Sequence, residues 1–448
     1  MRPDPWSYAL VTAVAAVVTG ALVPLFCRLS VRTGSVVQPD ERRVHKHPTP
    51  VLGGGAMYLG FVVAFVVAWL SGWFDAVFDS STEPIGVLVS ATLCYGVGLI
   101  DDLREISAPA KTAGLVLGGS TLFFSGVSIL WLIIPLGSPL VLSPDLSYLV
   151  TVFWLLGMAN AVNLIDGLDG LAAGIVAIGA AAFLLYGLRL GSDEVGLLLD
   201  SNIGPLIAAL VLGICLGFLP WNFHPARIFM GDSGALMLGG LMAAATMAVG
   251  GRTQDPFSGQ TYFFYAPLVI PLLILGVPIA DTAFAILRRA SRRQGLATAD
   301  KGHLHHRLLR LGHGQRRSVA ILWAWTALLS GLVLFPTYSG KGDAVVPIGV
   351  AGLCLLLYTV FHPGVRRERR ERRNGHAASA HAGGVLRPAE PPVASGPRLA
   401  ADPAPLLVPG SSRSSAPVPS ATATASTAID AELEPSRLRQ PAPVRAPE

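Results

Sequence analysis

Charged residues are scarce in this sequence: Asp, Glu, Lys and Arg make up 14% of its 448 residues, whereas hydrophobic residues make up 52%. In soluble globular chains roughly a quarter of the residues are charged. The mean hydropathy of this chain, +0.56, is far higher than that of soluble globular chains. The composition therefore excludes an ordinary soluble enzyme and predicts a polytopic membrane protein. The formal net charge is +5, but nothing in the distribution of basic residues calls for nucleic acid as a partner.

Cysteine is also rare. The four cysteines stand in apolar segments without a CxxC pair, so the sequence indicates neither a disulfide nor a zinc site. They are predicted to be small buried hydrophobic residues: Cys27, Cys94, Cys215 and Cys354. No HExxH motif occurs, which argues against a membrane metalloprotease.

Long apolar runs dominate what is present. Eleven of them approach the length that crosses ~30 Å of hydrocarbon. They cover residues 6–28, 53–72, 85–100, 111–131, 147–163, 170–190, 202–220, 233–250, 263–287, 318–336 and 344–362. We therefore expect an all-α membrane protein with about eleven transmembrane helices, contained in one membrane-embedded domain of residues 1–365. Positive charge follows the first run, which argues against a cleaved signal peptide.

The basic residues set the orientation. With the N-terminus outside, the inward connections hold 23 Lys and Arg residues and the outward ones hold four, so the N-terminus is predicted outside and the C-terminus in the cytoplasm. Every polar cluster then falls on the cytoplasmic face, which predicts one active site there. The outward stretch 132–146 is predicted to form a small β-hairpin. Residues 366–448 are predicted to be a basic anchor, RRERRERR, followed by a disordered Ala/Pro/Ser-rich tail.

The stretch GMANAVNLIDGLDGLAAG, residues 157–174, brings Asn160, Asn163, Asp166 and Asp169 between two apolar segments. A carboxylate at the edge of hydrocarbon is costly unless it meets a cation, a hydrogen-bond donor or water. The intervening glycines permit the chain to bend. We expect the four polar side chains to converge on the mouth of one site; the alternative is a helix end that merely surfaces at the interface.

Asp101 and Asp102 end another apolar run and are followed by Arg104 and Lys111. Adjacent helical residues point about 100° apart, so the two carboxylates are expected to have different roles. One would orient a cation or a lysine, and the other would act as a base. The alternative is an interfacial acid pair that the two basic residues neutralise.

Asp232 stands in the sequence GDSG, close to the aromatic Phe229. It is either a simple N-cap for the helix that follows or a ligand for a hard cation. Mg²⁺ keeps several waters and takes one or two carboxylates together with phosphate oxygens, so Asp232 with Asn163 or Asp166 would suffice. Phe229 is available to stack on a base.

Two further segments are rich in basic residues and histidines. They are expected to donate hydrogen bonds to phosphate or sugar oxygens, because a zinc site would want fewer cations nearby. The alternative for each basic residue is simply its contribution to membrane orientation. The candidates are Arg43, His45, Lys46, His303, His305, His306 and Arg307.

Carboxylates for Mg²⁺, cations for phosphates and an aromatic for a base, all beside the bilayer, suit phosphoryl transfer between a soluble phosphate ester and a lipid phosphate. A secondary transporter is the competing class. It would place acids at the membrane midplane and polar groups toward both sides. Only Asp281 is expected to be deep, and the outward loops carry ordinary turn residues.

Five ordered motifs, RRVHKHPTPVLGG, LIDDLREISAPAK, NAVNLIDGLDGLAAG, FHPARIFMGDSGALMLG and HLHHRL, resemble those of the polyprenyl-phosphate N-acetylhexosamine-1-phosphate transferases, glycosyltransferase family 4. The resemblance covers about residues 34–317, or 1–362 with the apolar runs. It implies transfer of a sugar 1-phosphate from a UDP-N-acetylhexosamine to a polyprenyl phosphate with release of UMP, in a bacterial plasma membrane. HLHHRL is similar to the UDP-GlcNAc branch, with the phospho-MurNAc-pentapeptide transferase branch as the alternative.

The resemblance also implies roles for single residues. Asp101 and Asp102 match the catalytic acid pair, and Asp232 matches the ligand of Mg²⁺, or of Mn²⁺ in its place, with Asn163 as a second candidate ligand. Substrate contacts are implied for Lys111, Asp169, Phe229, His303, His305, His306 and Arg307. The residue pattern alone predicts substrate contacts for Asn160, Asp166, Arg43, His45 and Lys46. The sequence leaves open the exact sugar, the isoprenoid length and whether the chain forms a homodimer.

Overall fold

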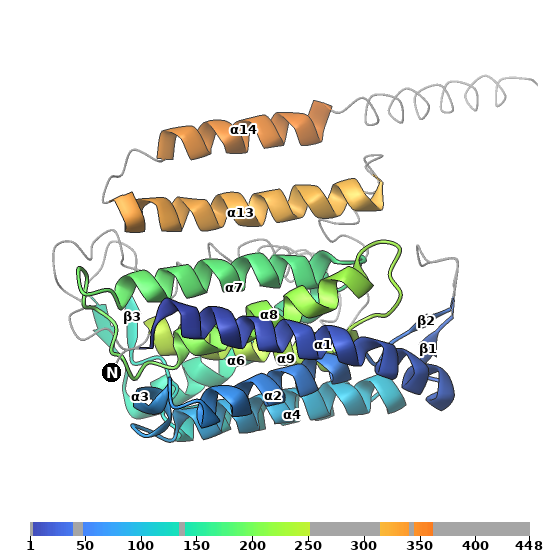
Figure 1. Cartoon of the computed structure of the whole chain (residues 1–448), viewed down its shortest axis with the longest axis horizontal. Helices are drawn as coiled ribbons and strands as arrows, with labels where there is room; N and C mark the ends of the chain where they lie inside the picture. Colours follow the sequence, from blue (N-terminus) through green and yellow to red (C-terminus); the bar gives the residue numbers. More distant parts are fainter. Residues whose placement is uncertain (1–2, 39–47, 134–138, 251–313, 340–344, 362–448) are drawn as a thin grey trace, which may run out of the picture. The chain divides into compact units, whose positions relative to one another are not determined.

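The computed structural model describes residues 3–38, 48–133, 139–250, 314–339 and 345–361 (Figure 1). Its helices are α1 (Pro5–Thr33), α2 (Gly53–Leu70), α3 (Asp75–Phe78), α4 (Glu83–Arg104), α5 (Ala108–Phe124), α6 (Pro144–Ile165), α7 (Leu171–Leu190), α8 (Gly204–Asn222), α9 (Gly231–Gly250), α13 (Gln315–Ser339) and α14 (Val345–Phe361). Two antiparallel strand pairs join β1 (Val36–Val37) to β2 (Thr49–Pro50) and β3 (Trp131–Ile133) to β4 (Pro139–Val141).

Eight of the described helices are long and apolar enough to cross a membrane: α1, α2, α4, α6, α7, α8, α9 and α13. Helices α5 and α14 have 17 residues each, close to the shortest length that spans a bilayer. The predicted run 263–287 lies outside the described residues. The chain is therefore a mostly helical, multi-pass membrane protein, whereas the number of eleven spans and the orientation of the termini stay predictions.

Proline and glycine mark several helix boundaries. Proline stands in the first turn of α1, α4, α5, α6 and α8, where its missing N–H has no intrahelical partner to lose. Gly34 ends α1 in the left-handed conformation, with φ +74°. Gly170, also with φ +74°, stands between α6 and α7, which confirms the bend predicted in residues 157–174.

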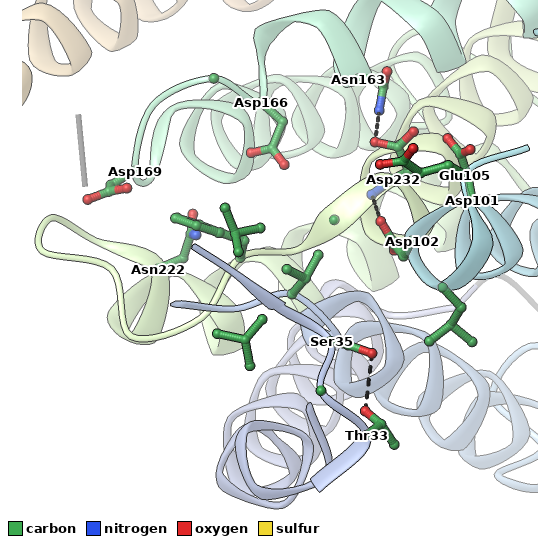
Figure 2. Close-up of a pocket in the computed structure, with 18 of the residues that line it drawn as sticks. Thr33, Ser35, Asp101, Asp102, Glu105, Asn163, Asp166, Asp169, Asn222 and Asp232 are labelled. Atoms are coloured by element: carbon green, nitrogen blue, oxygen red, sulfur yellow. Dashed lines mark hydrogen bonds between the residues drawn. The ribbon is translucent and has the colours of Figure 1, made fainter. Parts of the chain in front are cut away.

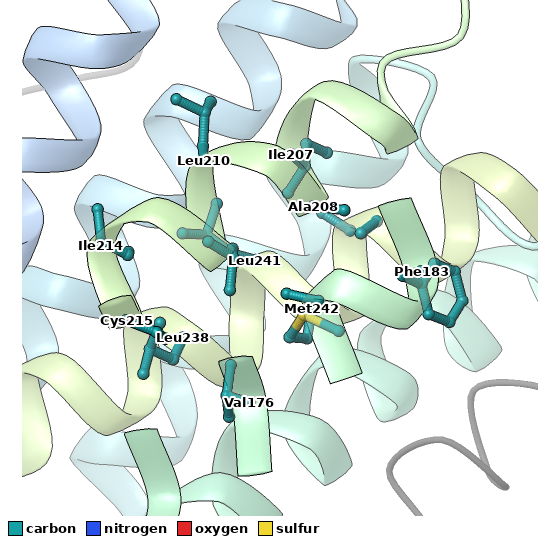
Figure 3. Close-up of a cluster of buried hydrophobic side chains, with 14 of the residues drawn as sticks. Val176, Phe183, Ile207, Ala208, Leu210, Ile214, Cys215, Leu238, Leu241 and Met242 are labelled. Carbon is teal, nitrogen blue, oxygen red and sulfur yellow. The ribbon is translucent and has the colours of Figure 1, made fainter. Parts of the chain in front are cut away.

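Helix α9 is the most deeply buried of the described membrane helices and packs against α2, α4, α6, α7 and α8. In a membrane, close packing of apolar side chains holds helices together, because lipid offers no hydrophobic driving force between them. The side chains that fill the space between α7, α8 and α9 include Val176, Phe183, Ile207, Leu210, Ile214, Leu238, Leu241 and Met242 (Figure 3). This packing fixes the start of α9 relative to its neighbours.

Two smaller predictions have clear outcomes. The hairpin predicted in residues 132–146 is confirmed, with Leu132 opposite Leu140 in the β3–β4 register. Cys94 and Cys215 are buried, as predicted, and Cys27 is half-buried. The prediction is wrong for Cys354, which is exposed on α14, where most described side chains are exposed. The predicted tail, residues 366–448, lies outside the described residues.

Candidate active site

A cavity of 880 Å³ opens where the C-terminal ends of α1, α4 and α6 meet the start of α9 (Figure 2). Its lining residues come from within the segments 33–37, 101–105, 163–169 and 229–232, together with Val51 and Asn222. Asp166 and Asp169 lie on one side of it, and Thr33 and Ser35 lie on the opposite side. The structure therefore brings together polar segments that are up to about 200 residues apart in the sequence.

The cavity is strongly acidic. Among its described lining residues, six carry a carboxyl group and none is a lysine or an arginine. So many like charges repel one another and attract cations. An anionic ligand would bind here only with cations supplied by a metal ion or by basic side chains from elsewhere. The six are Asp101, Asp102, Glu105, Asp166, Asp169 and Asp232.

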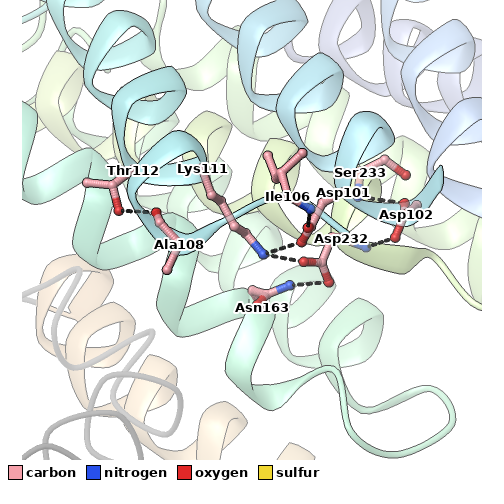
Figure 4. A network of polar contacts seen from close by, with 9 residues as sticks. All are labelled: Asp101, Asp102, Ile106, Ala108, Lys111, Thr112, Asn163, Asp232 and Ser233. Carbon is pink, nitrogen blue, oxygen red and sulfur yellow. Dashed lines mark hydrogen bonds and ion pairs between the residues drawn. The ribbon is translucent and has the colours of Figure 1, made fainter. Parts of the chain in front are cut away.

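Lys111 provides one cation at the edge of this cluster. Its Nζ donates to Asp101 Oδ2 at 3.0 Å and to Asp232 Oδ2 (Figure 4). The side chains of Lys111 and Asp101 are 17% and 18% exposed, so water screens the interaction only partly. Because the three residues belong to α5, α4 and α9, the lysine fixes these helices around two carboxylates.

The two adjacent acids have different contacts, as the sequence predicted. Asp101 Oδ1 accepts a hydrogen bond from the Ile106 N–H at 2.9 Å, so this side chain faces the turn that leads into α5. Asp102 faces the opposite way. Its Oδ1 and Oδ2 accept from the backbone N–H groups of Asp232 and Ser233 at 2.8 and 3.0 Å. The assignment of a catalytic base to either acid stays a prediction.

Asp232 stands in the first turn of α9, which begins at Gly231. Its Oδ1 accepts from Asn163 Nδ2 at 2.8 Å, and its Oδ2 accepts from Lys111. The interpretation of Asp232 as a simple N-cap is therefore wrong. Asp102 accepts the N–H bonds at this helix terminus, and the Asp232 carboxylate is left to face Lys111 and Asn163.

Asp166 follows the last residue of α6 and lines the cavity beside these groups. Burial, and then the negative charges of Asp232, Asp102 and Asp169, raise the pKa of Asp166 to about 8. Both causes disfavour the carboxylate. A cation in the cavity would offset both effects, so Asp166 would ionise when a cation binds.

Asp169 holds the loop between α8 and α9. Its Oδ2 lies 2.6 Å from His224 Nδ1 and accepts from the Ala226 N–H at 3.1 Å. Asn222 strengthens the junction, because its Oδ1 accepts from the Gly170 N–H at 3.0 Å. Sequence reasoning missed Asn222 and His224. Their signal was the presence of polar side chains in WNFHP, where an apolar helix ends.

Phe229 is half-buried and lines the cavity. Its N–H donates to Pro50 O at 2.8 Å, and its carbonyl accepts from the Gly53 N–H at 3.0 Å, so the start of α2 fixes its position. Thr33 and Ser35 on the facing wall were also missed. They are ordinary hydroxyl residues at a helix end, and nothing in their local sequence distinguishes them.

Not every candidate reaches the cavity. Asn160 is absent from the lining, and its Nδ2 donates to Leu156 O in its own helix at 2.8 Å. Its proposed contact with substrate stays a prediction. The remaining candidates lie outside the described residues: Arg43, His45, Lys46, His303, His305, His306 and Arg307.

The donor set fits a hard divalent cation. In the part of the chain that the structure describes, no three His, Cys, Asp or Glu side chains are arranged as a closed metal site. Mg²⁺ does not require one, since it takes one or two carboxylates with waters and phosphate oxygens. Asp232 with Asn163, beside the excess of carboxyl groups, meets that requirement.

Comparison with known proteins agrees with this geometry. Residues 84–250 match the family model described as glycosyl transferase family 4. The chain is 37% identical over 365 residues to the decaprenyl-phosphate N-acetylglucosaminephosphotransferase of Mycolicibacterium smegmatis, covering 80% of this chain and 89% of that protein.

Two further relatives differ in their named reactions. A probable undecaprenyl-phosphate N-acetylglucosaminyl 1-phosphate transferase of Bacillus subtilis is 35% identical over 303 residues, covering 67% of this chain and 77% of that protein. A phospho-N-acetylmuramoyl-pentapeptide-transferase of Staphylococcus aureus is 28% identical over 344 residues, covering 73% and 97%. The chain is thus more similar to the two relatives named for N-acetylglucosamine.

Proposed function

The chain belongs to glycosyl transferase family 4, and from that membership we propose that it transfers N-acetylglucosamine 1-phosphate from UDP-GlcNAc to a polyprenyl phosphate. The products are UMP and a polyprenyl diphosphate-linked GlcNAc. Relatives named for this transfer are 35–40% identical over most of their length. The 28% identity to the muramoyl-pentapeptide relative supports GlcNAc as the sugar over the MurNAc-pentapeptide alternative.

The observation that carries the proposal is the convergence of carboxylates and one ammonium at the end of membrane helices. We propose that the lipid phosphate reaches this place from the bilayer and that the water-soluble nucleotide reaches it from solution. Both substrates are anionic, so the carboxylates would repel them without a cation. A bound Mg²⁺ would neutralise phosphate oxygens and the charge that develops on the departing UMP.

In the proposed reaction, an oxygen of the lipid phosphate attacks the phosphorus that carries GlcNAc, and the bond from that phosphorus to the UMP oxygen breaks. UMP leaves with the bonding electron pair, so no oxidant or reductant is needed. Asp232 and Asn163 would hold the cation, and Lys111, which donates to the Asp232 carboxylate, would keep that side chain in position. Phosphoryl transfer depends mainly on such positioning and charge neutralisation.

We place the reaction at the cytoplasmic face of a bacterial plasma membrane. The excess of Lys and Arg in one set of connections supports this orientation, and UDP-sugars are water-soluble donors. The lipid-linked GlcNAc would start a cell-envelope glycan. The histidines and arginine in residues 303–307 are proposed to contact the sugar and diphosphate, as the family resemblance implies.

The protein in lipid nanodiscs, supplied with polyprenyl phosphate, should release UMP from UDP-GlcNAc in a divalent-cation-dependent reaction. UDP-GalNAc and UDP-MurNAc-pentapeptide, tested in competition, should be poorer donors. Asp232→Asn is the matched negative control, because it retains the size of the side chain and removes the charge. Transfer of MurNAc-pentapeptide phosphate in preference to GlcNAc phosphate would overturn the assignment of the sugar.

A further inference from the structure

The two acids at the end of α4, Asp101 and Asp102, have different contacts. Those of Asp102 indicate a role other than direct catalysis. Asp102 makes both of its described hydrogen bonds to backbone N–H groups of α9, at 2.8 Å to Asp232 and 3.0 Å to Ser233. The first N–H groups of a helix have no partner within the helix. A carboxylate that accepts from two of them is a cap supplied by another helix, and the positive end of the helix dipole favours its charge.

The backbone around Asp102 is shaped for this contact. Gly231 has φ +68°, and a Cβ on it would lie 2.5 Å from Asp102 Oδ2. Gly98, one turn earlier on α4, has no space for a Cβ either, because Asp232 O and the Ser233 backbone would lie 2.4 Å from it. The backbones of helices α4 and α9 are therefore in close contact at Asp232.

We infer that Asp102 is a positioning residue: it fixes the first turn of α9 and thereby the direction of the Asp232 side chain, and it does not take a proton from the acceptor substrate. The inference rests on the proposed function for its effect on activity. The geometric part stands on its own, since both Asp102 oxygens are directed at α9 (Figure 4). Among the described hydrogen bonds, those of Asp101 go to Lys111 and to the Ile106 N–H, and none goes to the α9 backbone.

Hydrogen exchange at the amides of Asp232 and Ser233 tests the cap directly, and it requires neither substrate nor activity. In the full-length protein in nanodiscs, Asp102→Asn should speed exchange at these two amides by about tenfold or more, because a loss of ~1.4 kcal/mol already gives a factor of ten and bonds to a charged acceptor exceed that. Asp101→Asn, the matched control on the neighbouring residue, should change it less than twofold. Unchanged exchange in Asp102→Asn would overturn the inference.

The dependence of UMP release on Mg²⁺ separates positioning from proton transfer. Asp102→Asn should raise the half-saturating Mg²⁺ concentration about tenfold, and high Mg²⁺ should restore most of kcat, because the Asp232 carboxylate is still present. A kcat that stays lost at every Mg²⁺ concentration, despite faster exchange at α9, would assign Asp102 to the chemical step and overturn the inference. If the wild-type protein released no UMP, the proposed function would fail while the exchange result could still be interpreted.

Gly231→Ala provides a second variant that leaves every carboxylate in place. Its Cβ should displace Asp102 from α9 and raise the Mg²⁺ requirement in the same direction. Gly196→Ala is the matched control, because Gly196 also has positive φ, +61°, but nothing lies within 4 Å of its added Cβ. Equal Mg²⁺ requirements in the two glycine variants would contradict a role for the Asp102 contact.

Discussion

Asn163 Nδ2 donates to Asp232 Oδ1 at 2.8 Å and so joins the end of α6 to the start of α9. The amide turns one carboxylate oxygen toward α6, while Lys111 contacts the other. Asp232 is thereby held from two sides without being fully neutralised, since it faces one ammonium that it shares with Asp101. A shared cation leaves the carboxyl cluster with a net negative charge, which is the condition under which a divalent cation binds.

The first prediction concerns Asn163. Asn163→Ala should raise the Mg²⁺ concentration needed for half-maximal UMP release by about tenfold, the effect expected when one ligand or its orienting partner is lost. Asn160→Ala is the matched control: it stands one helical turn earlier, and its amide contacts only Leu156 O among the described hydrogen bonds. Equal effects of the two substitutions would show that the Mg²⁺ requirement does not depend on the hydrogen bond from Asn163 to Asp232.

The second prediction concerns Lys111. Lys111→Met should reduce kcat by about a hundredfold, the cost typical of removing one preorganised charged donor from an active site. Two carboxylates would then face each other without the ammonium between them. Lys111→Arg retains the charge and should retain part of the activity. Steady-state UMP release measures both. Wild-type turnover in Lys111→Met would exclude the lysine from the site.

The helices were predicted well from the sequence, because an apolar run must be long enough to cross the bilayer if it forms a transmembrane helix. The run 85–100 became α4, Glu83–Arg104. The helix extends past the apolar residues because Asp101 and Asp102 find partners there, and no local pattern reports those partners. The end of α5 was not predicted either. The helix ends at Phe124, although the apolar run continues to residue 131.

The candidate site was predicted in outline. Asp101, Asp102, Asn163, Asp166 and Asp232 do line one cavity, because charged groups beside hydrocarbon must share a wet region. The sequence predicted that the two adjacent acids would differ. The groups that each acid contacts depend on how closely α4 approaches α9, which the sequence does not show. The positions of Thr33 and Ser35 at the end of α1 were not predicted, because only tertiary packing places these residues opposite the carboxylates.

The third prediction concerns pH. The folded-state pKa of Asp166, about 8, is higher than the value of ~3.9 expected for an unfolded chain. The folded protein therefore keeps a proton that the unfolded chain releases, and this contribution to stability is complete below about pH 4 and is lost as the pH rises to about 8. Wild-type thermal stability in EDTA should fall over that window. Asp166→Asn, which imitates the protonated group, should flatten the dependence.

The control for this experiment is the same titration with Mg²⁺ present. A cation in the cavity favours the ionised carboxyl, so it should lower the pKa of Asp166 and weaken the loss of wild-type stability between pH 5 and pH 8. Identical slopes for wild type and Asp166→Asn in EDTA would show that another group causes the pH dependence. Detergent-solubilised protein, followed by its tryptophan fluorescence, suits the measurement, because the chain has eight tryptophans.

The last prediction tests the proposed contact between Phe229 and the uracil ring. Phe229 lines the cavity, and backbone hydrogen bonds to Pro50 and Gly53 hold its main chain in place. Stacking of a base on an aromatic ring is worth ~1–3 kcal/mol, so Phe229→Ala should raise the KM for UDP-GlcNAc by at least about fivefold. Its kcat should change less, because the ring contacts the nucleotide and not the phosphorus under attack.

Phe223→Ala is the matched control for Phe229→Ala. Phe223 stands in the same loop but packs near Trp323, with ring centroids 6.0 Å apart, and does not line the cavity. Its substitution should leave the KM for UDP-GlcNAc within about twofold of wild type, and Phe229→Trp should preserve most of the affinity because stacking needs only a flat aromatic face. If both alanine variants raised KM equally, the effect would come from the loop as a whole, and Phe229 would lose its place as the base-stacking residue.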